Sequence, residues 1–149
     1  MHSVLLLLHS WFRWVVLLAG LLAFARMVAG WTMSLPWTSG DRRTGLLFTV
    51  TLDIQFLLGV SLYAVSPLIR KALGDMATAM RTSDVRFFVA EHPAMMLVAL
   101  ALAHVGSIAA RRAATDGAKF RRGALFFGLS MALMLWAIPW FRLFPGLSS

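Results

Sequence analysis

The segment VLLLLHSWFRWVVLLAGLLAFARMV, residues 4–28, decides the class of this protein because Arg13 and Arg26 are its only acidic or basic side chains apart from one histidine. A helix rises about 1.5 Å per residue, so a run of this length crosses the roughly 30 Å apolar core of a bilayer. Unpaired backbone groups are not tolerated in lipid, which favours a helix. No basic residue precedes Val4, so we expect a retained span rather than a cleaved signal peptide.

Three further apolar segments follow the first one along the chain. They cover residues 45–65, 85–110 and 123–141, and each approaches or exceeds the length that a transmembrane helix needs. Short connections between consecutive spans favour an up-down order. The sequence therefore predicts one transmembrane domain over residues 1–149, an all-α integral membrane four-helix up-down bundle with spans at about 4–28, 45–65, 85–110 and 123–141.

The composition supports this class and excludes others. Apolar residues make up 60% of the chain and charged residues 13%, whereas soluble domains average roughly 45–50% and about 25%. Such a chain is too apolar for a soluble globule or a disordered segment. The net charge of +8 is attributed to loop cations and contact with anionic membrane lipids, and no nucleic-acid partner is expected. Cysteine is absent, which excludes disulfides and thiolate metal sites.

The loop charges predict the orientation. The first and third connections with their flanks carry eight cations, and the second connection with the C-terminal segment carries five. Since cytoplasmic loops are enriched in Lys and Arg, this bias places both termini outside the cytoplasm in a multi-pass protein.

The second connection predicts a short amphipathic helix on the outer membrane surface. Ser66 and Pro67 are typical of an N-cap and a first helical residue. Apolar side chains then recur at helical spacing among charged ones, which is the pattern of a surface-bound helix; they are Ile69, Leu73, Met76 and Met80.

Ionisable residues within the spans are the main functional signal, because they are costly in the hydrocarbon core and often mark a site. His9 lies about five residues into the first span, and His92 lies about seven residues into the third. These two spans run in the same direction, so the imidazoles are expected at nearly equal depth. Two histidines facing each other across a bundle are able to supply both axial ligands of a haem iron. The sequence therefore predicts His9 and His92 as metal ligands.

Two other residues complete the predicted site. Arg13 lies one helical turn from His9 on the same face, where its cation is expected to face a haem propionate or Asp53. The alternatives are a structural ion pair with Asp53 or Glu91, or a side chain that extends toward the membrane surface. Gly59 in the second span falls near the level of the two histidines and leaves room for a bound group.

His104 is expected to play a different role. It lies twelve residues after His92, which is about 18 Å along a helix. A second haem there would need a ligand near Leu21 in the first span, and leucine cannot ligate iron. His104 is therefore interpreted as a hydrogen-bonding core residue or a contact for a quinone.

Several motifs resemble those of small bacterial four-helix membrane proteins labelled cytochrome b-like. They are His9-Ser10-Trp11-Phe12-Arg13-Trp14, Arg86-Phe87-Phe88-Val89-Ala90-Glu91-His92, Met95-Met96, Arg111-Arg112-Ala113-Ala114-Thr115-Asp116 and Ile138-Pro139-Trp140. The resemblance covers nearly the whole chain. It implies a location in the bacterial inner (cytoplasmic) membrane and a b-type haem, with His9 and His92 as the matched histidines. Members of that family often have a histidine near the position of Gln55, where this chain has Asp53-Ile54-Gln55.

Three functional hypotheses follow. The leading one is electron transfer through one bis-histidine haem b near the outer face, with a quinone or a redox protein as partner. The second is a non-catalytic accessory subunit of a larger respiratory or photosynthetic membrane complex. The third is a small transporter or proton-conducting protein. A six-coordinate iron has no open position for a substrate, so an independent enzyme is not expected.

Overall fold

A computed structural model describes residues 1–140 of the chain. Its helices are α1 (His2–Thr32), α2 (Ser39–Val65), α3 (Pro67–Gly74), α4 (Met76–Arg81), α5 (Ser83–Arg86), a π-helical turn η1 (Phe87–Glu91), α6 (His92–Arg111) and α7 (Asp116–Ala137). Residues 1–140 contain no β-strand. The predicted all-α class is therefore confirmed.

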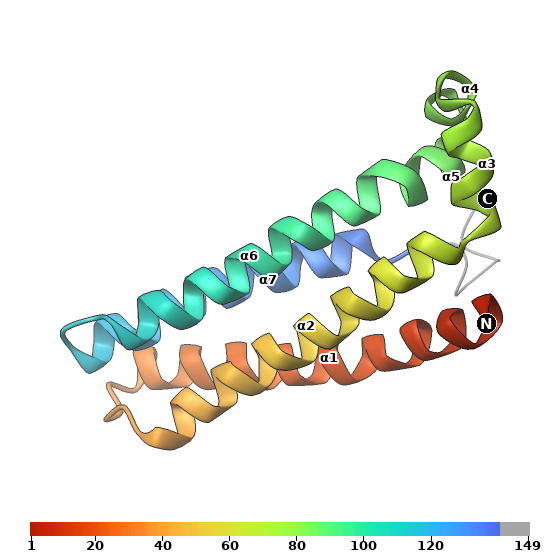
Figure 1. Ribbon diagram of the computed structural model, residues 1–149. Coiled ribbons are helices and arrows are strands. Elements are labelled where there is room, and N and C mark those ends of the chain that lie inside the picture. The colour runs from red at the N-terminus through yellow and green to blue at the C-terminus, as the bar shows by residue number, and fades with distance from the viewer. Residues whose placement is uncertain (141–149) are drawn as a thin grey trace.

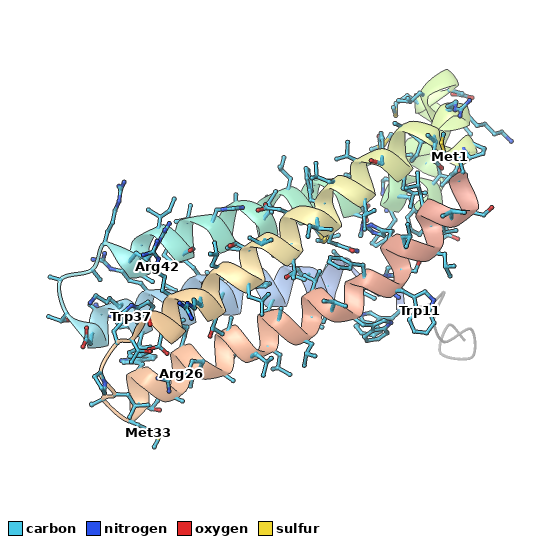
Figure 2. All side chains as sticks on the ribbon, turned by 60° about the horizontal axis from the view of Figure 1, so that its bottom comes forward. Met1, Trp11, Arg26, Met33, Trp37 and Arg42 are labelled. Carbon is cyan, nitrogen blue, oxygen red and sulfur yellow. The ribbon has the colours of Figure 1, made fainter. Side chains whose placement is uncertain are left out.

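The long helices α1, α2, α6 and α7 lie alongside one another and alternate in direction (Figure 1). The α1–α2 and α6–α7 connections lie at one end of the molecule. The N-terminus, the short helices α3–α5 and the last turn of α7 lie at the opposite end. Figure 2 shows the same polarity, with Arg26, Trp37 and Arg42 near the first end and Trp11 toward the second.

Three of the helical segments are long and apolar enough to cross a membrane. They are His2–Thr32, Ser39–Val65 and the continuous stretch Ser83–Arg111. The fourth predicted span, residues 123–141, is not among them. Helix α7 begins with the charged segment 116–122 and ends at Ala137, so its apolar part is about five residues short of the usual ~20. The predicted end at residue 141 lies outside the described residues.

Large apolar side chains cover the outside of the bundle, whereas in a soluble bundle they are mostly buried. Many large aliphatic residues point outward; on α1 alone they include Leu7, Val15, Leu18, Leu21 and Leu22. The shared core is built from alanines and a few large side chains; it contains Ala23, Met27, Phe48, Leu52, Ala99, Ala103, Phe120, Ala124 and Phe127. Small residues at the contacts allow the helices to approach closely, as is common between helices in membranes.

The connection between α1 and α2 is held by a buried carboxylate. Asp41 is 1% exposed, and it accepts hydrogen bonds from the Arg26 side chain and from the backbone and hydroxyl of Thr38. The Thr38 hydroxyl in turn accepts from the Asp41 N–H, which forms a reciprocal cap at the start of α2. Arg26 therefore neutralises a charge that would otherwise be costly to bury.

A second carboxylate joins this connection to α7. The Trp37 backbone N–H donates to Asp116 Oδ2 at 3.0 Å, and Lys119 donates to Asp116 Oδ1 at 2.9 Å. The Trp37 N–H and the Lys119 ammonium hold the pKa of the Asp116 carboxyl below its usual value. Because the pKa is lowered in the folded state, this contact contributes fully to folding stability above about pH 4. That contribution is lost as the pH falls through the lowered pKa.

The predicted surface helix is present as two short helices. Ser66 caps α3 by accepting from the Ile69 N–H, and Pro67 is its first residue, as predicted. The single-helix interpretation is wrong, because Asp75 leaves the helical conformation and its side chain caps α4 through the Thr78 N–H. The predicted apolar stripe is divided in consequence. Ile69 is buried beside Ala72, Ala79 and Val89, whereas Leu73, Met76 and Met80 remain exposed.

Close contacts at glycine hold the α1–α7 interface. A Cβ atom added at Gly30 would lie 2.3 Å from ring carbons of Phe120. The Phe120 side chain is fully buried and packs against Trp37 at a tilt of 58°, with ring centroids 4.9 Å apart. The ring therefore has little freedom to move, and the interface requires glycine at position 30.

We expect Gly30→Ala to lower the free energy of unfolding by about 1–3 kcal/mol, because overpacking forces a buried ring to shift. Gly117→Ala is the matched control, since nothing lies within 4 Å of its added Cβ and alanine favours the helix. Thermal unfolding of both variants in detergent measures the difference. Equal stability of the two variants would contradict the packing argument.

Candidate functional site

The structure brings together the imidazoles of His9 on α1 and His92 at the start of α6. Their ring centroids are 6.2 Å apart, and the ring planes make an angle of 77°. Both side chains are partly buried. The two histidines are 83 positions apart in the sequence, so their proximity results from the packing of the long helices.

The orientation of His92 is set by the end of α7. Ile138 precedes Pro139 and has an extended backbone (φ −75°, ψ 129°), as expected for a residue before proline. The helix therefore ends at Ala137, whose carbonyl group has left the regular helical pattern. The Ala137 carbonyl lies 2.8 Å from His92 Nδ1. A carbonyl only accepts, so Nδ1 carries the proton and Nε2 is left with a lone pair.

The backbone at His92 is shaped by Pro93. Proline has no N–H, so Pro93 cannot donate to the carbonyl of Val89 four residues earlier. The chain widens into the π-helical turn η1, in which the His92 N–H bonds to the Phe87 carbonyl. The Tyr63 hydroxyl on α2 donates to the Val89 carbonyl at 3.0 Å. Tyr63 therefore supplies the hydrogen bond that Pro93 removes.

Gln55 on α2 contacts His9 directly. It is 3% exposed, and its Nε2 donates to the His9 carbonyl oxygen at 2.9 Å and lies 3.3 Å from His9 Nε2. Gly59, one turn further along α2, lies against the same ring, because an added Cβ would be 3.1 Å from His9 Cε1. Helix α2 thus presents an amide and a bare backbone to His9.

Arg13 is near the histidines but makes neither of the predicted ion pairs. Asp53 pairs with His104 and Glu91 pairs with Arg86, so the expected Arg13–Asp53 and Arg13–Glu91 contacts are absent. The Arg13 guanidinium lies 5.3 Å from the centre of the Trp14 ring, within the range of a cation–π contact.

Three buried polar atoms gather around His9. They are His9 Nδ1, Arg13 Nε and Gln55 Oε1, and each has no hydrogen-bond partner among the described residues. Buried polar atoms are nearly always paired in proteins, and leaving one unpaired is costly. Such a cluster of exceptions identifies this region as the candidate site. The same residues carry nitrogen atoms, an amide oxygen and a cation.

His104 forms a separate polar pair. Its Nε2 lies 2.8 Å from Asp53 Oδ1, and both side chains are a little under half exposed. The interpretation of His104 as hydrogen-bonded is correct, but its placement in the core is wrong, because the pair lies on the surface between α2 and α6. No group of three or more His, Asp and Glu side chains suited to a metal ion occurs within residues 1–140.

Tyr63 is the site residue that the sequence interpretation missed. The signal for it was Pro93, which leaves the carbonyl four residues earlier without its helical donor. The donor itself comes from another helix, 26 positions away, so only tertiary packing identifies it.

Comparison with known proteins finds no family model, no curated protein and no solved structure that matches this chain.

We expect Tyr63→Phe to lower the free energy of unfolding by about 1–3 kcal/mol, because the Val89 carbonyl loses its partner while the ring is kept. The matched control is Ser61→Ala, since the Ser61 hydroxyl bonds to Leu57 within its own helix and is exposed. Chemical unfolding followed by circular dichroism checks both variants. A loss no greater than that of Ser61→Ala would contradict this role.

Proposed function

We propose that this chain is a multi-pass protein of the bacterial inner membrane whose four long helices form an up-down transmembrane bundle. The outward-facing leucines of α1 and the alanine-rich core support this proposal, since lipid replaces water as the surrounding solvent. Helix α7 crosses as the shortest span. The exposed Leu73, Met76 and Met80 on α3 and α4 then contact the outer membrane surface.

The orientation follows from the cations at the two ends. The end formed by the α1–α2 and α6–α7 connections carries the eight Lys and Arg residues of these connections and their flanks. The positive-inside rule places this end in the cytoplasm. Both termini, the candidate site and the short helices α3–α5 are then on the outer side.

We propose that one b-type haem binds between His9 and His92, and the single observation that carries this is the placement of the two rings. The two ring centroids are 6.2 Å apart, so one imidazole nitrogen from each side chain would be able to hold the same iron ion. The Ala137 carbonyl at His92 Nδ1 leaves Nε2 available to iron, and such a second hydrogen bond is usual for a metal-binding histidine.

The residues around the two imidazoles are compatible with the other parts of a haem. Arg13 would supply a cation for a propionate. Gly59 seats the His9 ring against α2, because an added Cβ would lie 3.1 Å from His9 Cε1. Gln55 is the side chain that has to turn, because its Nε2 lies 3.3 Å from the His9 nitrogen that would ligate iron. When bound, the haem supplies one-electron transfer. With two protein ligands, the site serves electron transfer between a quinone and a redox partner protein, not substrate binding at iron.

The chain's own residues set the properties of this site. The Ala137 carbonyl fixes the tautomer of His92 and its ring orientation. Arg13 places a positive charge one turn from His9, which favours an anionic ligand. Partial burial between the helices lowers the local dielectric constant, so each of these interactions is stronger than it would be at a fully aqueous surface.

An accessory role in a larger membrane complex is the second candidate. The observation that favours it is the half-exposed His104–Asp53 pair, which in a four-span bundle faces lipid. Ionisable side chains in that position are rare unless they are covered. A partner helix with a hydrogen-bonding side chain would cover the pair, and this role is compatible with haem binding.

We expect the full chain, expressed with sufficient haem, to show sharp b-type bands in a reduced-minus-oxidised absorption spectrum. His9→Ala and His92→Ala are expected to abolish these bands, because each removes one of the two residues that would hold the iron. His104→Ala is the matched control and is expected to keep them, since its ring pairs with Asp53 instead.

A folded, colourless preparation would rule out the haem proposal. Loss of the bands in His104→Ala alone would rule out the ligand assignment while keeping the class of cofactor. Co-purification of membrane subunits with the colourless protein would favour the accessory role.

A further inference from the structure

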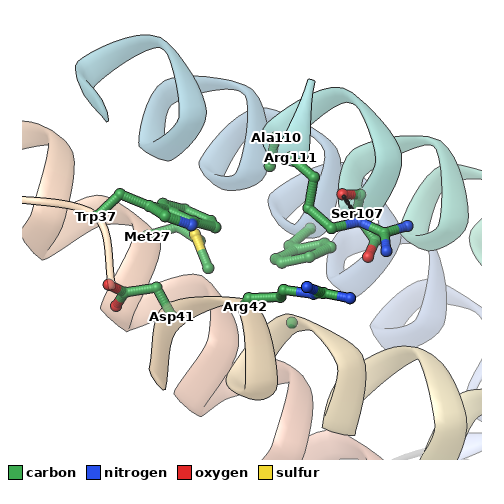
Figure 3. A pocket seen from close by; sticks show the side chains of 9 residues that line it. Met27, Trp37, Asp41, Arg42, Ser107, Ala110 and Arg111 are labelled. Carbon is green, nitrogen blue, oxygen red and sulfur yellow. Dashed lines mark hydrogen bonds between the residues drawn. The ribbon is translucent and has the colours of Figure 1, made fainter. Parts of the chain in front are cut away.

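We propose that the cytoplasmic end of the bundle holds the phosphate headgroup of an acidic phospholipid between Arg42 and Arg111. This site is separate from the histidine site, and its placement at lipid headgroups rests on the proposed membrane orientation. A narrow cleft at this end is lined by residues of all four long helices and of the α1–α2 connection (Figure 3); they are Met27, Trp37, Asp41, Arg42, Gly45, Ser107, Ala110, Arg111 and Phe127.

The two arginines approach the cleft from different helices. Arg42 lies near the start of α2 and Arg111 is the last residue of α6. Figure 3 shows their side chains extending in the same direction, with both guanidinium groups at one side of the cleft. Neither guanidinium has an ion-pair partner among residues 1–140. Two like charges that converge without an acid between them favour an anion.

The Arg111 side chain is already oriented. Its Nε donates to the Ser107 carbonyl at 3.1 Å, which leaves the two terminal nitrogens for another acceptor. A guanidinium presents its donors in a planar fork that matches two oxygens of a phosphate. Orientation by the backbone lowers the entropy cost of binding such a group.

The carboxylate in the cleft does not oppose this anion. Both oxygens of Asp41 are already bonded, Oδ1 to Arg26 and Oδ2 to Thr38. In Figure 3, Asp41 lies on the opposite side of the cleft from the two guanidinium groups. Its charge is therefore balanced by Arg26, and the cations of Arg42 and Arg111 remain uncompensated.

The rest of the cleft favours a lipid over free phosphate. The cleft has a volume of about 10 Å³, which is room for about one water molecule. A phosphate is too large to enter it and would lie at its mouth, between the arginines. The cleft wall is largely apolar, with Met27, Ala110 and Phe127 among its residues. Both arginines lie at the ends of candidate spans, where headgroups are found. Basic pockets between helices on the cytoplasmic side are typical sites for acidic headgroups.

The test uses the purified, delipidated full chain in a neutral detergent with three probes. These are short-chain phosphatidylglycerol, phosphatidylcholine of the same chain length, and inorganic phosphate, each titrated by calorimetry. We expect phosphatidylglycerol to bind more tightly than either of the other probes. Arg42→Gln and Arg111→Gln are each expected to weaken its binding about tenfold, because each removes a charge-assisted hydrogen bond.

Arg43→Gln and Arg112→Gln are the matched controls, since they remove the adjacent cations, which do not line the cleft. They are expected to weaken binding less than twofold. Arg42→Lys and Arg111→Lys retain the charge but not the planar fork, and they provide a second pair if a glutamine variant does not fold. Intermediate losses in these lysine variants support the site.

Three results would overturn the proposal. If the cleft variants and the control variants lost the same affinity for phosphatidylglycerol, only a general effect of charge would be shown. Equal binding of phosphatidylglycerol and phosphatidylcholine would show that no acidic headgroup is selected. Inorganic phosphate binding as tightly as the lipid would overturn the lipid assignment and identify free phosphate as the ligand of the two arginines.

Discussion

The need to pair every buried backbone group is the constraint on which this structure most depends. Pro93 removes a donor within an apolar helix, and the chain responds with a π-helical turn and a hydrogen bond from Tyr63 to the Val89 carbonyl. Pro139 ends α7, and the Ala137 carbonyl is then bonded to His92 Nδ1. The two prolines therefore set both the backbone at His92 and the direction of its ring.

The two ends of the molecule have different chemistry because their charges are paired differently. At the connection end, Arg26 neutralises Asp41, while Arg42 and Arg111 have no acid partner among the described residues. At the opposite end, one buried polar atom in each of His9, Arg13 and Gln55 has no hydrogen-bond partner within residues 1–140. In this part of the chain, the connection end thus presents unpaired cations, and the opposite end presents buried imidazole, guanidinium and amide atoms without partners.

The sequence predicted the helices well because apolar length and capping are local properties. Ser66 and Pro67 begin α3 as expected, since a cap involves only neighbouring residues. The predicted helix ends were less accurate where a helix stopped before its apolar pattern did. Asp75 divides the surface helix by capping α4, and the end of α7 at Ala137 shortens the fourth apolar helix. Of the partners expected for Arg13, the carboxylates of Asp53 and Glu91 are instead paired with His104 and Arg86.

Composition and the rise per residue were enough to predict the all-helical class and the three long apolar helices His2–Thr32, Ser39–Val65 and Ser83–Arg111. Which side chains meet depends on how the helices pack. This packing placed Gln55 and Gly59 against His9, paired Asp53 with His104, and brought the Ala137 carbonyl to His92. The rotation and tilt of each helix decide these contacts, and both result from the packing of alanine, glycine and phenylalanine across all four long helices.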